Sequence, residues 1–330
     1  MKMNNTRQSE LWSIILAGGE GKRTQPMIKR WLGYHKPKQF CAFMGQRSML
    51  QHTWDRADQL SLSQHKVTVV GKEHRREVWS QFADRRTGHV VVQPRNCDTA
   101  AGVFLPLTYI RAKNPEATVA LYPSDHFVFP ENHFIETVYR AVKAAEYLAD
   151  RVILVGMIPT SLELEYGWIF PSHHLGWNTG APIYAVNTFL EKPDRAQAQV
   201  AMETGALWNT MVLAAKVETL WNLGRRCFPD LMELFECLGS SIGLPEEGQV
   251  LESIYRTMPT RNFSSDLLQQ VPEHVGAVEL KGVMWSDWGR PERIIETLQA
   301  LGKIPVFPMV APAQGFHFPV TKDSTLKTSV

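Results

Sequence analysis

The sequence WSIILAGGEGKR, residues 12–23, decides the fold class of this chain. Its apolar part, Trp12–Leu16, has the composition of a buried strand, and it runs straight into a turn that contains Gly18, Gly19 and Gly21. In α/β sheets ligands bind at the carboxyl ends of the strands, where glycines allow backbone amides to approach a phosphate chain. The stretch therefore predicts an α/β protein with an anion-binding loop after the first strand.

The same alternation of strand and helix continues outward through the first half of the chain. Further strands are predicted at Lys66–Val70, His89–Val92, Ala117–Tyr122 and Val152–Val155. Amphipathic helices are predicted at Leu50–Leu60, His74–Arg86, Thr99–Ala112 and Asn132–Leu148. This order is typical of a largely parallel sheet with helices on both faces.

The second half of the chain is less regular. Strands are predicted at Gly167–Phe170, Ile183–Leu190 and Leu207–Ala214, and helices at Val217–Leu238 and Gln249–Gln270. A lid or a substrate-facing subregion fits this pattern.

Composition and charge exclude several classes of protein. The 330 residues include 35 Lys and Arg against 33 Asp and Glu, and this near balance predicts no nucleic-acid partner. Apolar runs stay well short of the roughly 18 residues that span a bilayer, and the first ten residues lack the apolar segment of a signal peptide. We therefore expect a cytoplasmic protein with no membrane partner. The four cysteines form no CxxC pair, so neither a zinc cluster nor a disulfide framework is predicted.

The glycine loop fits neither of two familiar phosphate-binding motifs. A Walker A motif would need glycine at Leu16 and serine or threonine at Arg23, and a dinucleotide fingerprint would need glycine at Thr24. The loop continues into the basic segment IKRWLGYHKPKQF, which is expected to bring Arg23, Lys36 and Lys38 within reach of one polyanion such as a triphosphate. The alternative is a glycine turn beside a solvated basic surface.

A resemblance to a known family goes beyond what spacing shows. LAGGEGKR followed by KPKQF resembles the signature of sugar nucleotidyltransferases, most closely the mannose-1-phosphate guanylyltransferases. The segments QPRNCDTAAG, PSDHF, YGWI, FLEKPD, LWNTMV and VMWSDWG resemble later motifs of that family, in the family's order, from residue 12 to about residue 300. The resemblance implies a Rossmann-like, doubly wound mixed sheet with a helical, sugar-binding subregion.

The resemblance also implies the reaction and the catalytic residues. The family transfers a nucleoside monophosphate from a nucleoside triphosphate to a sugar 1-phosphate, and the closest match implies GTP and mannose 1-phosphate as substrates and GDP-mannose and pyrophosphate as products. Arg23 and Lys38 match residues that hold the triphosphate and stabilise the departing pyrophosphate. Asp125 and Asp287 match carboxylates that bind Mg²⁺, a cation that prefers oxygen ligands. Without the resemblance, each aspartate alone would be interpreted as a turn or cap residue.

Substrate-binding residues carry over from the same motifs. The nucleotide-binding positions are Leu16, Ala17, Gly18, Gly19, Gly21, Lys22, Gln93 and Thr99. Gln93 matches the position that reads the base, and Asp98 and Thr99 are also expected to start a helix. The sugar-phosphate positions are Gly167, Glu191, Lys192 and Asn209. We expect a flexible N-terminus at residues 1–10, a nucleotidyltransferase domain at 11–303 with its sugar-binding subregion at about 160–275, and an irregular C-terminal tail at 304–330.

Three departures from the family pattern leave alternatives open. Lys22 stands where the family usually has threonine, and Cys97 and Asp98 fall in a segment that has lost an arginine. The same reaction with another base or sugar, a catalytically silent nucleotide-sugar sensor, and a metal-dependent glycosyltransferase are the competing hypotheses. A glycosyltransferase of that kind would need a DxD motif, whereas PSDHF has one aspartate. The oligomeric state stays open, with a homodimer as one option.

Overall fold

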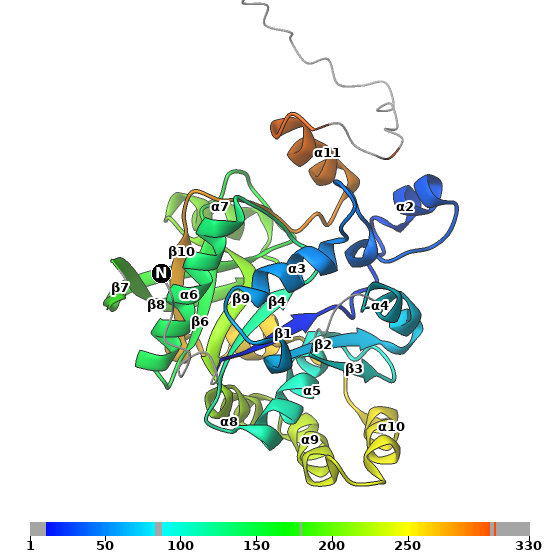
Figure 1. Cartoon of the computed structure of the whole chain (residues 1–330). Coiled ribbons are helices and arrows are strands. Elements are labelled where there is room, and N and C mark those ends of the chain that lie inside the picture. Colours follow the sequence, from blue (N-terminus) through cyan, green and yellow to red (C-terminus); the bar gives the residue numbers. More distant parts are fainter. Residues whose placement is uncertain (1–10, 83–87, 179, 304–306, 308–330) are drawn as a thin grey trace, which may run out of the picture.

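A nine-stranded mixed sheet forms the centre of the molecule (Figure 1). The computed structural model describes residues 11–82, 88–178, 180–303 and 307. Across the sheet, the strands are β3 (His89–Gln93), β2 (Lys66–Gly71), β1 (Leu11–Leu16), β4 (Thr118–Pro123), β9 (Leu207–Lys216), β6 (Val152–Met157), β10 (Val275–Leu280), β8 (Ala181–Glu191) and β7 (Gly167–Asn178). Strands β3, β2, β1 and β4 are parallel, β9 runs antiparallel between β4 and β6, and β8 and β7 form an antiparallel hairpin at the far edge. The predicted α/β fold class with a mixed sheet is confirmed.

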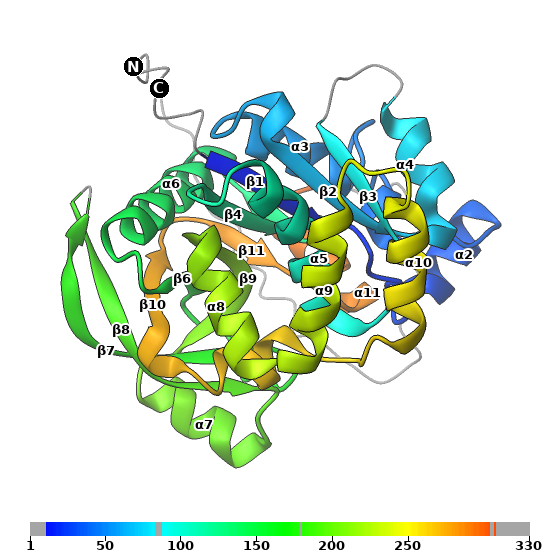
Figure 2. The same ribbon diagram turned by 90° about the horizontal axis from the view of Figure 1, so that it is seen from below.

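Helices cover both faces of this sheet. The α-helices of the described residues are α2 (Gln25–Leu32), α3 (Met49–Asp58), α4 (Arg75–Phe82), α5 (Asp98–Lys113), α6 (Glu131–Tyr147), α7 (Arg195–Glu203), α8 (Val217–Cys227), α9 (Pro229–Ser241), α10 (Glu247–Thr257) and α11 (Pro291–Ala300). Ile14 packs in a core with α5, α8, α9 and α10, while its neighbour Ile15 packs in a core with α3, α4, α6 and α7. Successive side chains of a strand point to opposite faces, so β1 contributes to both cores. Figure 2 shows α5, α8, α9 and α10 together on one face.

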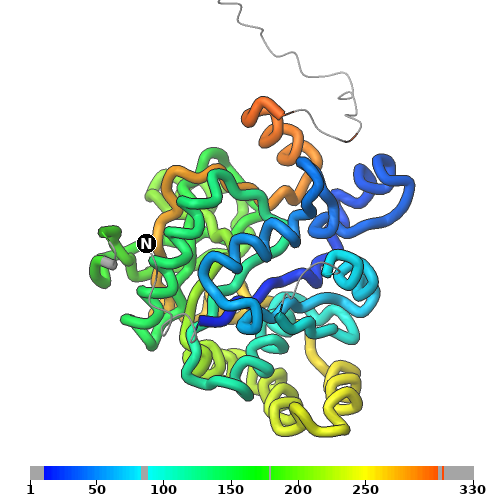
Figure 3. Tube along the Cα trace, viewed as in Figure 1, coloured from blue at the N-terminus to red at the C-terminus, as the bar shows by residue number. Residues whose placement is uncertain are grey.

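The C-terminal helix α11 packs against α2, the helix that follows β1 in the sequence. Met27 and Ile28 of α2 share a buried cluster with Ile294 and Leu298 of α11. In Figure 3 the orange C-terminal segment returns beside the blue segment that follows β1. A sequence-distant segment is thereby placed next to the glycine loop.

Two predicted helices differ from the structure because of prolines. Val217–Leu238 is not one helix, because α8 ends at Cys227 and α9 starts at Pro229, a residue that fits the first turn of a helix but not its interior. Gln249–Gln270 is not one helix either, because α10 ends at Thr257 and the residue before Pro259 is extended. A five-residue π-helix, Ser264–Leu268, follows.

Both predicted terminal segments lie almost wholly outside the described residues. In the segment 304–330, the structure describes Phe307, which is buried and whose ring contacts Trp31 and Phe43. Among the described helices, none combines the length and the apolar character needed to cross a bilayer.

Candidate active site

Two short strands bring Asp125 and Asp287 to one place. β5 (Phe127–Phe129) starts two residues after Asp125, and β11 (Met284–Ser286) ends one residue before Asp287. The two strands pair antiparallel, with Phe127 opposite Ser286. The aspartates therefore lie at the same end of this ladder, although they are far apart in the chain.

Lys38 joins the two aspartates. Its Nζ lies 3.1 Å from Oδ2 of Asp125 and donates hydrogen bonds to the backbone oxygens of Asp287, at 2.5 Å, and Trp288, at 3.1 Å. The Lys38 side chain is only 4% exposed. An ammonium group has three donors, so all three are directed at protein oxygens. Arg23 lies at the edge of this group, with its Nη2 4.0 Å from Oδ2 of Asp287. The structure thus brings together all four residues that the resemblance marked as catalytic.

Both aspartates are ionised at neutral pH. Burial favours the neutral form of Asp287, but Lys38 and Arg293 outweigh it and lower its pKa to about 2. Burial also opposes ionisation of Asp125, and the charges of Lys38 and His126 again hold the pKa below its ordinary value. Two half-buried carboxylates that stay charged beside one another are suited to a cation.

The position of Asp287 is fixed by three donors to one of its oxygens. Oδ1 accepts hydrogen bonds from Oη of Tyr166 at 2.9 Å, Nη1 of Arg293 at 2.7 Å and the backbone nitrogen of Gly289 at 2.9 Å. Tyr166 and Arg293 were not predicted from the sequence, although Tyr166 belongs to the YGWI motif. They hold the carboxylate in one orientation.

The residues present fit a magnesium ion. Oδ2 of Asp287 accepts no hydrogen bond from the described residues, and Oδ1 of Asp125 faces Nε2 of His126 at 3.7 Å, beyond hydrogen-bond distance. Each aspartate therefore keeps an oxygen for a metal. Mg²⁺ is commonly held by one or two carboxylates, with water and substrate phosphates as its remaining ligands. The described residues contain no cluster of three or more His, Cys, Asp or Glu side chains that could hold a metal.

A cleft of about 850 Å³ opens beside the glycine loop. Its lining residues are Leu16, Gly18, Gly19, Glu20, Lys22, Val69, Gln93, Asn96, Asp98, Thr99, Gly102, Lys192 and Thr260. Six of the eight positions predicted to bind the nucleotide are among them. The cleft is large enough for a nucleotide.

The glycine loop is held from within the protein by Gln39. Its Nε2 donates hydrogen bonds to the backbone oxygens of Ala17, at 2.9 Å, and Gly19, at 2.7 Å. Gly21 has a φ of +61°, a conformation that favours glycine. Gln39 was not predicted as a site residue, although it belongs to the KPKQF motif. The loop is therefore preorganised before any ligand arrives.

The base-reading candidate, Gln93, is packed between the loop and α10. A Cβ atom on Gly18 would lie 2.9 Å from Oε1 of Gln93, so only glycine at position 18 leaves this amide in place. Nε2 of Gln93 donates to Oη of Tyr255 at 3.2 Å. Arg95 in turn donates to the backbone oxygens of Tyr255 and Met258, and so fixes the end of α10 against β3. Tyr255 and Arg95 thus hold Gln93 and the end of α10 in place, a role that the sequence motifs did not predict.

The start of α5 differs slightly from the prediction. Helix α5 starts at Asp98 with Cys97 at the N-cap position, where no side chain caps the helix. Oδ1 of Asp98 accepts a hydrogen bond from the backbone nitrogen of Thr99 at 2.5 Å, and Oγ1 of Thr99 accepts one from the backbone nitrogen of Phe263 at 2.8 Å. Thr99 thus lines the cleft and also binds the segment after α10.

The sugar-phosphate candidates meet where β7, β8 and β9 come together. Gly167 pairs with Glu191 in the β7–β8 hairpin, and a Cβ on Gly167 would lie 2.8 Å from Oε2 of Glu191 and 3.3 Å from Cβ of Asn209. Burial raises the pKa of Glu191, and the adjacent Lys192 only partly offsets this. Lys192 has a φ of +48° and lines the nucleotide cleft, so it stands between the two predicted substrate sites.

Arg23 and Lys36 form ion pairs with carboxylates of other elements. Lys36 forms an ion pair with Glu77 of α4 at 3.4 Å, and Arg23 forms one with Glu165. Neither belongs to the described lining of the cleft, whereas Lys22, paired with Glu20 at 3.1 Å, does. Lys38 is likewise paired with a carboxylate distant in sequence, Asp125. That Arg23, Lys36 and Lys38 all face one polyanion stays a prediction.

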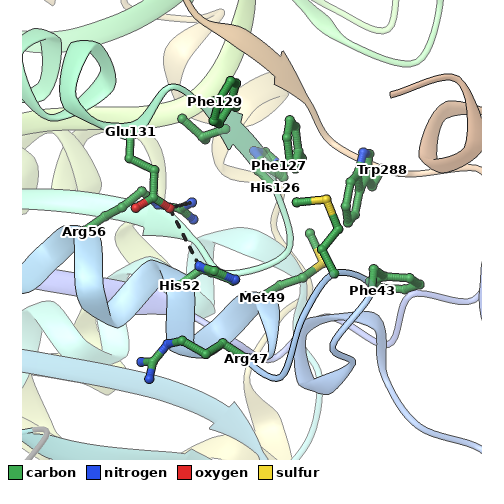
Figure 4. Close-up of a pocket in the computed structure, with 12 residues that line it drawn as sticks. Phe43, Arg47, Met49, His52, Arg56, His126, Phe127, Phe129, Glu131 and Trp288 are labelled. Atoms are coloured by element: carbon green, nitrogen blue, oxygen red, sulfur yellow. Dashed lines mark hydrogen bonds and ion pairs between the residues drawn. The ribbon is translucent and has the colours of Figure 1, made fainter. Parts of the chain in front are cut away.

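A second, smaller pocket lies beside the residues that follow Asp125 and Asp287 (Figure 4). Its volume is about 280 Å³, and its walls include His126 and Trp288, the residues that follow the two aspartates. Its charged groups compensate one another, since Arg56 lies 3.3 Å from Glu131. It contains none of the predicted site residues, so the larger cleft is the better candidate for the nucleotide.

Comparison with known proteins agrees with this geometry. Residues 12–303 match the model of the family described as nucleotidyl transferase. The chain belongs to this family. The match covers the glycine loop, both aspartates and the β7–β9 region, and it confirms the family predicted from the sequence.

Individual relatives are more distant. Mannose-1-phosphate guanylyltransferase 2 of Escherichia coli O157:H7 is 27% identical over 242 residues, which is 69% of this chain and 48% of that protein. Xanthan biosynthesis protein XanB of Xanthomonas campestris is 31% identical over 205 residues, which is 61% of this chain and 41% of that protein. The chain thus spans about half the length of these curated relatives.

Solved structures show the same fold. The crystal structure of mannose-1-phosphate geranyltransferase from Thermus thermophilus superposes with a TM-score of 0.72 at 26% identity and covers 87% of this chain and 79% of that one. UDP-glucose pyrophosphorylase complexed with UDP-glucose superposes with a TM-score of 0.57 at 15% identity, which supports the fold alone.

Proposed function

We propose that the chain transfers a nucleoside monophosphate from a nucleoside triphosphate to a sugar 1-phosphate, with GTP and mannose 1-phosphate as its substrates. The observation that carries the proposal is the meeting of Asp125, Asp287 and Lys38 beside a glycine-lined cleft of nucleotide size. The choice of GTP and mannose 1-phosphate is supported by the names of the relatives. Membership in the family alone leaves base and sugar open.

The reaction needs alignment and charge neutralisation more than covalent chemistry. A phosphate oxygen of mannose 1-phosphate attacks the α-phosphorus of GTP, the bond to the β-phosphate oxygen breaks, and pyrophosphate leaves. When bound, Mg²⁺ neutralises phosphate charge. Asp125 and Asp287 would hold it, since both keep an ionised, free oxygen. No covalent intermediate is required.

Lys38 acts on the aspartates in this account. Its three donors are used by Asp125 and by the backbone oxygens of Asp287 and Trp288. A direct contact with the triphosphate would cost one of these bonds. We therefore assign Lys38 to positioning both carboxylates and to lowering their pKa, so that they stay ionised.

The remaining residues place the two substrates against one another. Gln93, an amide with a donor and an acceptor, faces the loop and would read the base. Glu191 and Asn209 meet over Gly167, where a side chain would collide with both, and their carboxylate and amide would bind the sugar hydroxyls. Lys192 lines the nucleotide cleft directly after Glu191, and its ammonium group would bind the sugar phosphate.

A substrate matrix tests the proposal. Four nucleoside triphosphates are combined with mannose 1-phosphate, glucose 1-phosphate and galactose 1-phosphate, and pyrophosphate is measured with and without Mg²⁺. We expect the largest kcat/KM for GTP with mannose 1-phosphate, and no turnover without the metal. A larger value for another pair would assign a different base or sugar. Absence of pyrophosphate from every pair would favour the nucleotide-sugar sensor.

A further inference from the structure

Carboxylates bind the side chain of Arg23 beside the two aspartates. Its side chain is 51% exposed, it forms an ion pair with Glu165, and its Nη2 lies 4.0 Å from Oδ2 of Asp287. The adjacent Lys22 belongs to the described lining of the cleft, and Arg23 does not. The cation assigned to the triphosphate is therefore bound by carboxylates on the side of the sugar site.

Glu165 is held in place independently of Arg23. Its Oε2 accepts a hydrogen bond from Nη2 of Arg293 at 3.0 Å and lies 3.4 Å from Nε of Arg290. Arg293 is 7% exposed, and its guanidinium lies 4.5 Å from the centre of the Tyr166 ring. Tyr166 directly follows Glu165 in the sequence, and its hydroxyl group donates a hydrogen bond to Asp287. Glu165 is anchored to the catalytic carboxylate through buried groups.

The chain leaves room for Arg23 at this place. A Cβ atom on Gly289 would collide with Oδ2 of Asp287 and lie 2.8 Å from Nη2 of Arg23. Glycine at position 289 is what allows the guanidinium and the carboxylate to approach from the same side. The place of Arg23 thus depends on the glycine at position 289 as well as on its ion pair with Glu165.

We propose that Glu165 is a positioning residue that holds Arg23 in an ion pair until a triphosphate displaces it. An exposed ion pair stabilises little, so a polyphosphate with several negative charges can take Arg23 from one carboxylate. While Glu165 holds Arg23, the cleft has one cation fewer, and nucleotide affinity is lower than it would be otherwise. The inference rests on the proposed function in one respect, namely that Arg23 binds the triphosphate.

The test is calorimetric titration of the full chain with inorganic tripolyphosphate, without metal or sugar phosphate. Glu165→Gln should tighten binding roughly two- to fivefold, the range expected for release from an exposed ion pair. Glu163→Gln is the matched control, because Glu163 binds Arg290 and Arg293 but has no contact with Arg23 in the described residues. It should not tighten binding. In an Arg23→Ala background the effect of Glu165→Gln should vanish, since the two residues act on one interaction.

Equal or weaker binding by a folded Glu165→Gln variant would overturn the inference, and folding is checked by circular dichroism and thermal denaturation. If that variant does not fold, Glu165→Asp gives a second test, because the shorter carboxylate reaches Arg23 less well and leaves the guanidinium unchanged, so this variant should bind tripolyphosphate no more weakly than wild type. Clearly weaker binding by a folded Glu165→Asp would then contradict the inference. Failure of the proposed function is separate: tripolyphosphate carries no base or sugar, and Arg23→Ala alone shows whether Arg23 binds polyphosphate.

Discussion

Replacing Asp287 by asparagine removes a charge and almost preserves the shape of the side chain. In the folded chain, Oδ1 accepts hydrogen bonds from Tyr166, Arg293 and Gly289. The pKa is about 2 instead of 3.8, which corresponds to about 2 kcal/mol in favour of the ionised folded state. Asparagine still offers an oxygen to these donors, so the free energy of unfolding should fall by no more than about 2 kcal/mol.

Turnover should fall much further than stability. The lost charge is one of two that would hold Mg²⁺, and we expect on the order of 3 kcal/mol less transition-state stabilisation, roughly a hundredfold or more in kcat. The assay is continuous detection of pyrophosphate at saturating GTP, mannose 1-phosphate and Mg²⁺, beside urea denaturation of the same preparations. A folded Asp287→Asn variant with kcat within about threefold of wild type would refute the metal assignment.

Three further predictions concern the loop, the sugar site and pH. Gly18→Ala should raise the KM for the nucleotide roughly tenfold and change kcat less than threefold, because the Cβ of alanine would displace the Gln93 amide. Steady-state kinetics measure both constants, and an unchanged KM would contradict the proposed contact between position 18 and Gln93. Glu191→Ala should raise the KM for the sugar phosphate, while nucleotide affinity measured by titration stays within about twofold of wild type; a loss confined to the nucleotide would assign Glu191 to the other substrate. Because the folded pKa of Asp287 is below its unfolded value, its stabilising effect is present above about pH 4 and is lost as the pH falls toward 2. The stability difference between wild type and Asp287→Asn in urea should therefore shrink between about pH 5 and pH 3, and a constant difference would contradict the cited shift.

The sequence predicted the first half of the sheet well, because its strands are short apolar runs and its helices are amphipathic. Trp12–Leu16 and Val152–Val155 fall inside β1 and β6. The errors in the second half arose at Pro229 and Pro259, whose restricted backbone ended helices that apolar periodicity alone extended. Those two signals were present in the sequence.

Parts of the site could not be predicted from local patterns. Asp125 follows a buried strand, but its meeting with Asp287 depends on a three-residue ladder between β5 and β11 that has no clear periodic signal. Glu165 and Arg23 are far apart in the sequence, and only the folded chain shows that they form an ion pair. Contacts of this kind are tertiary, so family resemblance supplied the aspartates and could not supply Glu165.

The central claim is that Asp125 and Asp287 together hold one divalent cation beside the nucleotide. Titration with Mn²⁺ in the presence of GTP, followed by the electron paramagnetic resonance signal of the free ion, measures this directly. We predict about one bound Mn²⁺ per chain, and at least tenfold weaker binding in Asp125→Asn and in Asp287→Asn, since each loses a charged oxygen ligand. Binding of Mn²⁺ as tight as wild type in both folded variants would contradict the account.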